Sequence, residues 1–206
     1  NDTTKKCAGD PIANISADGT GISTSKAVSG GSTTNAMQTI TIGAGTLTAT
    51  NGSMPDAAIV LAGSTGNSMA QFTFSAANEG FTIDQLKLKV PNNFATSAAA
   101  ITVKYKDKAG AAKQSSAVFV TGAEADATAT FTNLSIYVPS NSDTSIDVYV
   151  DLAAIADGAT SGAVGTVTLD YNEGFNATKD SGGSPLTSVG SADLASNSFY
   201  VRKSKP

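Results

Sequence analysis

The chain of 206 residues contains no histidine. Ser-His-Asp and Cys-His catalysis, and the usual zinc and copper sites, depend on imidazole side chains. The glycine-rich phosphate loop, the dinucleotide-binding fingerprint and the G-x-S-x-G nucleophile turn are missing from the sequence as well. These absences argue against nucleophilic and cofactor-dependent enzymes. We therefore expect a protein without catalytic activity and without an organic cofactor.

Cysteine is nearly absent. Cys7 alone cannot form a disulfide within the chain, so the hydrophobic core has to stabilise the fold. Its thiol has three interpretations: an incidental side chain, a link between subunits, or a lipid attachment point near a processing site. No run of 18 apolar residues occurs, so we expect no membrane span. The opening NDTTKKC has neither an initiator methionine nor a signal peptide, and we interpret it as the start of a processed or excised product.

Charge and aromatic residues are scarce. Charged residues make up 15% of the chain and the net charge is −4. The few lysines are scattered, so nothing would neutralise a phosphate backbone, and we expect no nucleic acid partner. Tryptophan is absent, which argues against a carbohydrate-binding platform of stacked rings. What the sequence does contain is 40% hydrophobic residues and roughly one quarter serine and threonine, a mixture typical of short strands with a hydroxyl-rich surface.

Alternation of apolar and polar residues begins at Gln38 and recurs to the end of the chain. The alternating segments are QTITI, AAIVLAG, MAQFTFSA, FTIDQLKLKV, ITVKYK, AVFV, ATFTN, LSIYVP, SIDVYVDL, GTVTLDY and SFYVR. Turns rich in Gly, Asn, Asp and Pro separate them. This pattern predicts an all-β protein, with one antiparallel β-sandwich, Ig-like or jelly-roll, over residues 37–206. Residues 1–36 are too polar to fold alone and predict an extended N-terminal segment, either a donor strand or a linker.

The phase of the alternation predicts which side chains face the core. In AVFV it turns Val118 and Val120 inward, and in FTIDQLKLKV it shifts after Ile83, which indicates a bulge near Asp84. DLAAIADGA predicts a single helical turn that ends at Gly158. The other predicted core residues are Phe72, Phe74, Ile83, Leu88, Val103, Ile136, Val148 and Leu169.

Acidic residues are the remaining candidates for chemistry. Asp143, Asp147 and Asp151 would form the obvious catalytic cluster, but strand periodicity places them opposite the apolar face, as on any solvated strand. We therefore interpret them as surface residues rather than as a glycosidase-like acid pair.

The segment DYNEGFNATKDSGG concentrates oxygen ligands of the kind that Ca²⁺ prefers. Gly174 permits a tight bend, but the spacing departs from the EF-hand pattern and Lys179 would compete with a cation. Both a calcium loop and a polar surface loop are compatible with this segment. The candidate ligands are Asp170, Asn172, Glu173, Asn176 and Asp180.

N-x-[ST] sequons make several asparagines candidates for glycosylation, at a frequency close to that expected by chance in a Ser/Thr-rich chain. Besides Asn1, the candidates are Asn14, Asn51, Asn133 and Asn176.

GAGTLTATNG, LAGSTGNSMAQFTFSAANEGFTIDQLKLKV and the closing FYVRKSKP together resemble β-sandwich modules of large bacterial cell-surface proteins, of S-layer-like or extracellular filament type. In such proteins a short strand, a basic seam and a proline lead from one module to the next, so the resemblance implies that VRKSKP is a module seam. It implies a structural subunit at the cell surface, with copies of itself and surface glycans as partners. The alternative is an adhesin-type or carbohydrate-binding module.

A sandwich has edge strands whose unpaired backbone groups a strand from another chain can satisfy. The N-terminal segment suits such a donor because PIANI and GISTSKAV offer isolated apolar side chains at Ile12, Ile15, Ile22 and Val28. Lys26 weakens the second stretch, and both stretches stay open as donors. Head-to-tail donation would yield a filament, in which each subunit completes the next. The other interpretation of this segment is a disordered linker.

Overall fold

The computed structural model describes residues 15–20, 27–32, 44–122 and 125–203. The chain divides into two compact units, Asn1–Ile42 and Gly43–Pro206. The sequence pattern had placed this division between residues 36 and 37. The strand expected to start at Gln38, together with Cys7 and the candidate residues Ile12, Asn14 and Ile22, lies outside the described residues.

The described part of the first unit is a pair of antiparallel strands, β1 (Ile15–Thr20) and β2 (Ala27–Ser32). Ile15 lies opposite Ser32, and Val28 lies opposite Gly19. Two of the residues predicted to contact a neighbouring subunit are thus in strands that pair with each other. Whether they also meet another chain stays a prediction.

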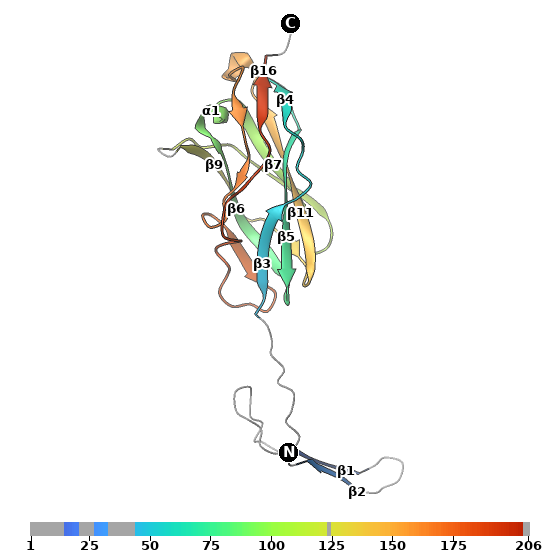
Figure 1. Ribbon diagram of the computed structural model, residues 1–206. Helices are drawn as coiled ribbons and strands as arrows, with labels where there is room; N and C mark the ends of the chain where they lie inside the picture. Colours follow the sequence, from blue (N-terminus) through green and yellow to red (C-terminus); the bar gives the residue numbers. More distant parts are fainter. Residues whose placement is uncertain (1–14, 21–26, 33–43, 123–124, 204–206) are drawn as a thin grey trace. The chain divides into compact units, whose positions relative to one another are not determined.

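The second unit, called the sandwich below, is built almost entirely from strands, as Figure 1 shows. Its elements are β3 (Thr46–Asn51), β4 (Ala58–Leu61), β5 (Asn67–Ala77), β6 (Phe81–Pro91), α1 (Asn92–Ala95), β7 (Ala98–Lys106), β8 (Ala112–Ala117), β9 (Asp126–Phe131), β10 (Ile136–Val138), β11 (Ser142–Leu152), the 3-10 turn η1 (Ile155–Asp157), β12 (Val164–Gly165), β13 (Thr168–Leu169), β14 (Asn176–Lys179), β15 (Leu194–Ala195) and β16 (Phe199–Arg202).

The strands form two facing layers. One layer is a five-stranded sheet in the order β3-β5-β11-β7-β8. The other has β6 at its centre, with β9 and β10 on one side and β13 and β14 on the other, while β15 pairs with β13. A short third sheet has the order β12-β16-β4, and β4 and β16 are parallel. The predicted all-β, antiparallel sandwich is confirmed, with this parallel pair as an addition.

The core lies between the layers. Side chains alternate in and out along the long strands, so every second residue is buried in β6, on either side of its bulge, and in β11 from Ile146 onward. Residues from both layers belong to one continuous hydrophobic cluster. All eight residues predicted for this core are fully buried: Phe72, Phe74, Ile83, Leu88, Val103, Ile136, Val148 and Leu169.

Two finer predictions of backbone geometry are confirmed. The register of β6 against β14 skips Asp84, since Ile83 pairs with Ala177 and Gln85 pairs with Asn176. This bulge explains why the inward phase shifts along β6. The predicted helical turn is η1, and it ends at Gly158, whose φ of 109° is in the left-handed region that glycine tolerates.

One prediction of inward phase is wrong. Val118 and Val120 are 61% and 64% exposed, whereas Phe119 between them packs against the core. The reason is that β8 ends at Ala117. The next residues cross to β9, where Val120 forms a bridge with Thr128 instead of continuing the alternation of β8.

The chain enters and leaves the sandwich at opposite ends. At one end, Thr46 of β3 pairs with Ala77, the last residue of β5, and the Asn78 side chain donates to the Ala44 carbonyl at 3.1 Å. At the other end, Ala62 donates to the Arg202 carbonyl at 2.8 Å, beside the turn that leads into the start of β5. The 11 residues of β5 correspond to about 35 Å of strand. These two ends are called the entrance pole and the exit pole below.

Candidate functional site

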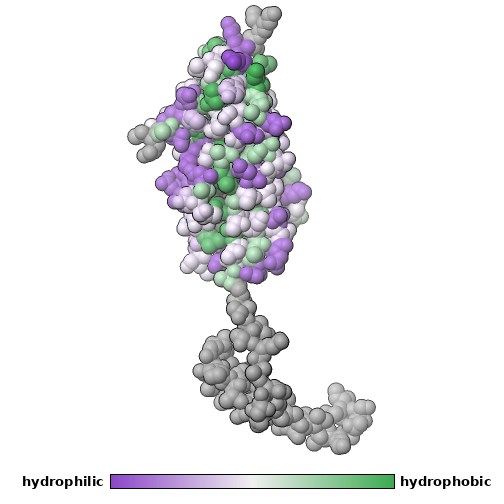
Figure 2. Space-filling model, viewed as in Figure 1, coloured by the Kyte–Doolittle hydropathy of each residue, from purple (hydrophilic) through white to green (hydrophobic). Residues whose placement is uncertain are grey.

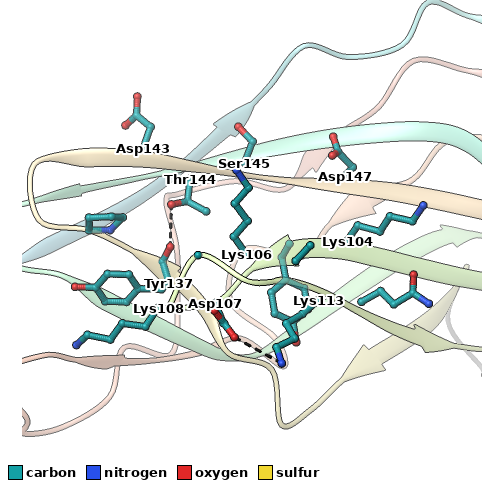
Figure 3. A pocket seen from close by; sticks show the side chains of 15 residues that line it. Lys104, Lys106, Asp107, Lys108, Lys113, Tyr137, Asp143, Thr144, Ser145 and Asp147 are labelled. Atoms are coloured by element: carbon teal, nitrogen blue, oxygen red, sulfur yellow. Dashed lines mark hydrogen bonds and ion pairs between the residues drawn. The ribbon is translucent and has the colours of Figure 1, made fainter.

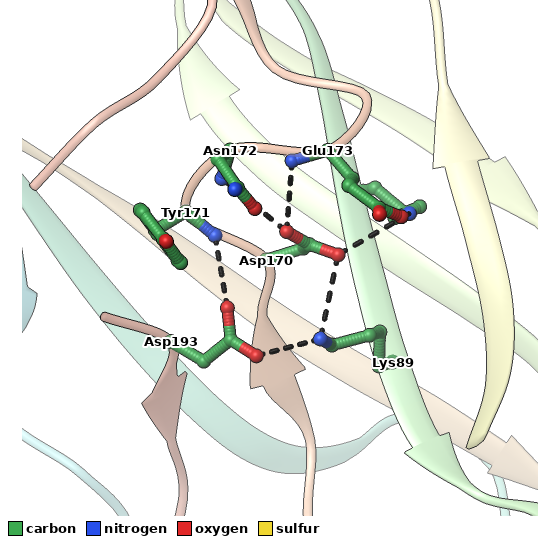
Figure 4. A network of polar contacts seen from close by, with 7 residues as sticks. Lys89, Asp170, Tyr171, Asn172, Glu173 and Asp193 are labelled. Atoms are coloured by element: carbon green, nitrogen blue, oxygen red, sulfur yellow. Dashed lines mark hydrogen bonds and ion pairs between the residues drawn. The ribbon is translucent and has the colours of Figure 1, made fainter. Parts of the chain in front are cut away.

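The segment considered as either a calcium loop or a polar surface loop is organised around two lysines. Asp170 follows β13 and is 2% exposed. One of its carboxylate oxygens accepts hydrogen bonds from the backbone N–H groups of Glu173 (2.9 Å) and Asn172 (3.3 Å). Its other oxygen lies 3.2 Å from Lys87 Nζ and 3.4 Å from Lys89 Nζ, both from the central strand β6 (Figure 4).

Each lysine has a second carboxylate partner. Lys87 contacts Glu173 at 2.5 Å, and Lys89 contacts Asp193 at 2.6 Å. Asp193 also accepts from the backbone N–H of Tyr171 at 3.2 Å (Figure 4). The result is a closed network in which the buried carboxylate is satisfied on both oxygens. It joins the segment after β13 to the middle of β6.

These contacts determine the pKa values of Asp170, Lys87 and Lys89. Burial raises the pKa of Asp170, but the backbone hydrogen bonds from Glu173 and Asn172 and the two lysines outweigh it and hold that pKa below its usual value. Burial likewise lowers the pKa of Lys87 and of Lys89, and their carboxylate partners more than reverse this effect. All of these groups are therefore charged near neutral pH, as in a structural ion-pair network.

The five candidate calcium ligands are not gathered at one point. Asp170 and Glu173 are engaged with lysines, Asn176 begins β14, and Asp180 binds Lys108 and Tyr137 on another side. Within the described ranges, no group of three or more Asp, Glu, Cys or His side chains is placed to hold a metal ion. At Asp170 and Glu173 the lysine ammonium groups contact oxygens that a cation would need, and calcium binding by this segment stays a prediction.

A groove with a volume of about 800 Å³ lies beside the β7–β8 hairpin (Figure 3). Lys108 projects near Tyr137, with its Nζ 4.7 Å from the ring centre and 2.8 Å from Asp180. Lys113 lies 3.7 Å from Asp107. The charged residues that line the groove are Lys104, Lys106, Lys108, Lys113, Asp107, Asp143 and Asp147. Because lysines and aspartates are interspersed, the groove has no strong charge of either sign.

The aspartates of β11 lie on the solvent side of the strand, and two of them make ordinary surface hydrogen bonds. Asp147 accepts from the Gln71 side chain at 2.7 Å, and Asp151 accepts from the Gly66 backbone at 2.6 Å. Asp143 lines the groove beside them. Asp170 is the one buried carboxylate among the described residues, and lysines rather than a second acid face it. That the protein is not an enzyme stays a prediction.

The glycosylation candidates differ in their surroundings. Asn51 is exposed, but its side-chain nitrogen donates to the Ala195 carbonyl at 3.1 Å. Asn133 is exposed in a turn with φ of 56°, and Asn176 is half-buried at the start of β14. Asn133 is thus the most accessible of the three described candidates.

Sequence reasoning missed the role of Lys87 and Lys89. Both alternate with Leu86 and Leu88 in QLKLKV, which reads as a polar strand face. The available signal was the coincidence of an acid-rich segment with lysines on the longest alternating strand. Pairing the two needed the strand order, because β6 and the segment after β13 are distant in sequence.

Comparisons with known proteins give structural similarity at low sequence identity. No family model matches the sequence, and no curated protein matches it. A cohesin module of a family 33 glycoside hydrolase from Clostridium perfringens is similar in structure, with 11% identity, a TM-score of 0.38, and coverage of 78% of this chain and all of that one. AvmM, which catalyses macrocyclization in alchivemycin A biosynthesis, has 9% identity and a TM-score of 0.37, with 78% and 90% covered.

A family 123 glycoside hydrolase from Clostridium perfringens has 11% identity and a TM-score of 0.36, with 77% of this chain and 28% of that one covered. A likeness of this degree does not identify a function, so function has to be argued from the residues. In the described part of the chain, none of the helices has the length and apolar character needed to cross a membrane.

Proposed function

We propose that the chain is a structural subunit of an extracellular filament or surface layer, joined to its neighbours by strand addition. The observation that carries this proposal is the position of the two poles. The chain enters the sandwich beside Asn78 and leaves it beside Ala62, at opposite ends of β5. A unit with contact surfaces at two opposite ends can be repeated end to end.

The arrangement of the chain suits head-to-tail assembly. The N-terminal unit continues from the entrance pole, and the exit pole is a different surface of the sandwich. A contact between these two surfaces is heterologous, so it need not close into a ring and can propagate. The expected partners are therefore further copies of the same chain.

The polar groups of the sandwich support a structural rather than a catalytic role. The negative charge of its buried carboxylate, Asp170, is balanced by the positive charges of Lys87 and Lys89, and all three groups are charged near neutral pH. A general acid or base instead needs a pKa close to the working pH. The network links β6 to the segment after β13, which suits a structural subunit.

Electron microscopy tests the proposal. We expect the purified full chain to form fibres or sheets in negative stain. Replacing residues 1–35 with a Gly/Ser linker of the same length should leave dispersed particles with the melting temperature of the wild type. Assemblies that persist unchanged after this replacement would show that the N-terminal segment does not join the subunits.

The groove beside the β7–β8 hairpin favours a second candidate, an adhesin-type or carbohydrate-binding module. Its volume of about 800 Å³ is within the range of ligand sites, and Tyr137 offers a ring for stacking. Titration of the full chain with an acidic and a neutral polysaccharide tests this function. Binding that is lost in a Tyr137→Ala variant, by a protein that stays dispersed in negative stain, would favour it over the structural role.

A further inference from the structure

Strand β4 presents an apolar edge at the exit pole. Ile59 and Leu61 are 65% and 50% exposed, while Val60 between them is buried. Tyr200 of β16 lies in register with Ile59 and is 42% exposed. Because neighbours in register point to the same side of a sheet, the three side chains share one face. Figure 2 shows hydrophobic surface at this end of the sandwich, where Figure 1 places β4 and β16.

The backbone of β4 is open on the side away from β16. β4 is the outermost strand of its sheet, with β16 as its neighbour. The Ala62 N–H donates to the Arg202 carbonyl, so Ala62 turns its backbone groups toward β16. Backbone groups alternate in direction along a strand, so those of Val60 also point toward β16, whereas those of Ile59 and Leu61 point away from it. The Leu61 carbonyl accepts from Ser64. Among the described residues, no hydrogen bond is found for the N–H and C=O groups of Ile59.

The other edges of the sandwich are less suited to strand addition. β8 carries the sequence AKQSSA, and β3 carries TLTATN with its threonines outward. Polar side chains and lysine on an edge protect it from pairing with another chain. Val118 and Val120 are exposed, but both backbone groups of Val120 already bond to Thr128. Compared with these described edges, the edge of β4 combines apolar side chains with free backbone groups.

The hairpin β1–β2 is a strand pair that lacks a third strand among the described residues. An isolated two-stranded hairpin is marginal in water, and a further strand stabilises it. Its strands read ISADGT and AVSGGS, so Asp18 is their single charged residue. The end of β16 carries exposed Arg202, in register with Leu61. Asp18 and Arg202 are thus opposite in charge.

We propose that the edge of β4 accepts the β1–β2 hairpin of a second copy of this chain. The hairpin extends the sheet β12-β16-β4, bonds the backbone of Ile59, and covers the face formed by Ile59, Leu61 and Tyr200. This inference rests on the proposed function, since it names the surface through which one subunit receives the N-terminal segment of the next.

Matched double variants of the full chain test the surface. Ile59→Thr with Leu61→Thr removes the apolar edge while threonine keeps a strong preference for strands. Val118→Thr with Val120→Thr makes the same kind of change at the other exposed pair. We expect the critical concentration for pelleting to rise about tenfold or more for the first pair, because its apolar contact is lost, and less than about twofold for the second. Circular dichroism and the melting temperature should match the wild type in both.

Disulfide formation between two labelled chains locates the contact directly. One chain carries Cys7→Ser with Leu61→Cys, and the other carries Cys7→Ser with either Ala17→Cys or Ser29→Cys, one in each hairpin strand. Mixed under mild oxidation, the two chains should form a disulfide-linked heterodimer. A control chain with Cys7→Ser and Val118→Cys should form it at least about tenfold more slowly, as expected for a site outside the contact.

The outcomes separate the two proposals. If the wild type assembles and the Ile59/Leu61 variant assembles equally well, with no heterodimer at Leu61, the β4 edge is not the acceptor and the structural role stands. A wild type that forms no assembly at any concentration would contradict both. Loss of assembly in the Ile59/Leu61 variant alone, together with the heterodimer, supports the inference.

Discussion

Two aspartates at the two ends of one segment make similar contacts in different surroundings. Asp180 lies 2.8 Å from Lys108 and accepts from the Tyr137 hydroxyl at 2.7 Å, on the surface. Asp170 lies 3.2 and 3.4 Å from its two lysines, yet it is buried and also accepts two backbone hydrogen bonds. The shorter ion pair is therefore the exposed one.

This difference teaches that distance alone does not rank ion pairs. Water and salt screen the contact of Asp180, and an exposed pair contributes little to stability. At Asp170 the carboxylate has already lost its water, so removal of its charge leaves each lysine with only its second, more exposed carboxylate partner. The segment between the two aspartates is anchored by Phe175, which is buried and stacks on Phe74 with ring centres 6.3 Å apart.

The largest effect on stability is expected for Phe74→Ala, which removes the ring on which Phe175 stacks. Phe74 is fully buried, so the change should lower the free energy of unfolding by about 3 to 5 kcal/mol, measured by denaturant titration. It should also weaken the packing of Phe175, which holds the segment between Asp170 and Asp180 against the core. Val118→Ala at an exposed position should change stability by no more than about 0.5 kcal/mol. A loss below about 1 kcal/mol for Phe74→Ala would reject the core assignment.

Asp170→Asn should have the next largest effect. The amide keeps an oxygen for the backbone N–H groups of Asn172 and Glu173 but removes the charge between Lys87 and Lys89. We expect a loss of about 2 to 3 kcal/mol in the free energy of unfolding. The matched control is Asp193→Asn, which removes the more exposed partner of Lys89 and should cost less than about 1 kcal/mol. Equal losses in the two variants would mean that burial does not distinguish these pairs.

The pH dependence of stability sharpens the same comparison. The pKa of Asp170 is lowered in the folded state, so its contribution is present above the ordinary carboxyl pKa of about 4 and is lost as the pH falls through the folded pKa. The pKa values of Lys87 and Lys89 are raised, so their contribution is lost as the pH rises above about 10. Melting temperatures of the wild type should therefore fall more steeply below pH 4 than those of Asp170→Asn. Parallel curves would contradict the assignment.

Much of the sandwich could be predicted from alternation alone. The strands from β5 to β11, except β8, bury one face each, so period 2 identifies their core residues, and the phase shift in β6 even locates the bulge at Asp84. The prediction failed at Val118 and Val120, because the alternation of β8 stops at Ala117 where the chain changes sheets. A periodic pattern cannot show where such a crossing occurs.

The candidate site was harder to predict than the fold. The acid-rich segment was identified, but its two interpretations, a calcium loop and a polar surface loop, considered only residues close in sequence. Lys87 and Lys89 come from β6, and the pairing of Leu88 with Leu169 brings them beside Asp170. Local composition thus identifies the carboxylates, and the counter-charge depends on strand order. The apolar edge of β4 was invisible for the same reason, since AIVL reads as core until its sheet is known.

The smallest effect on stability is expected for Asp180→Asn, the exposed counterpart of Asp170→Asn. Its hydrogen bond raises the pKa of Tyr137, and Lys108 acts in the opposite direction with a smaller effect. Without the carboxylate charge, the pKa of Tyr137 should fall toward or below its usual value, while the melting temperature stays that of the wild type because water screens the pair. Titration of the tyrosine signals by NMR measures the first change, with Tyr149 as an internal control that has no contact with Asp180. If the pKa of Tyr137 did not move, or if Asp180→Asn destabilised the protein as much as Asp170→Asn, exposure would not be what separates the two ends of this segment.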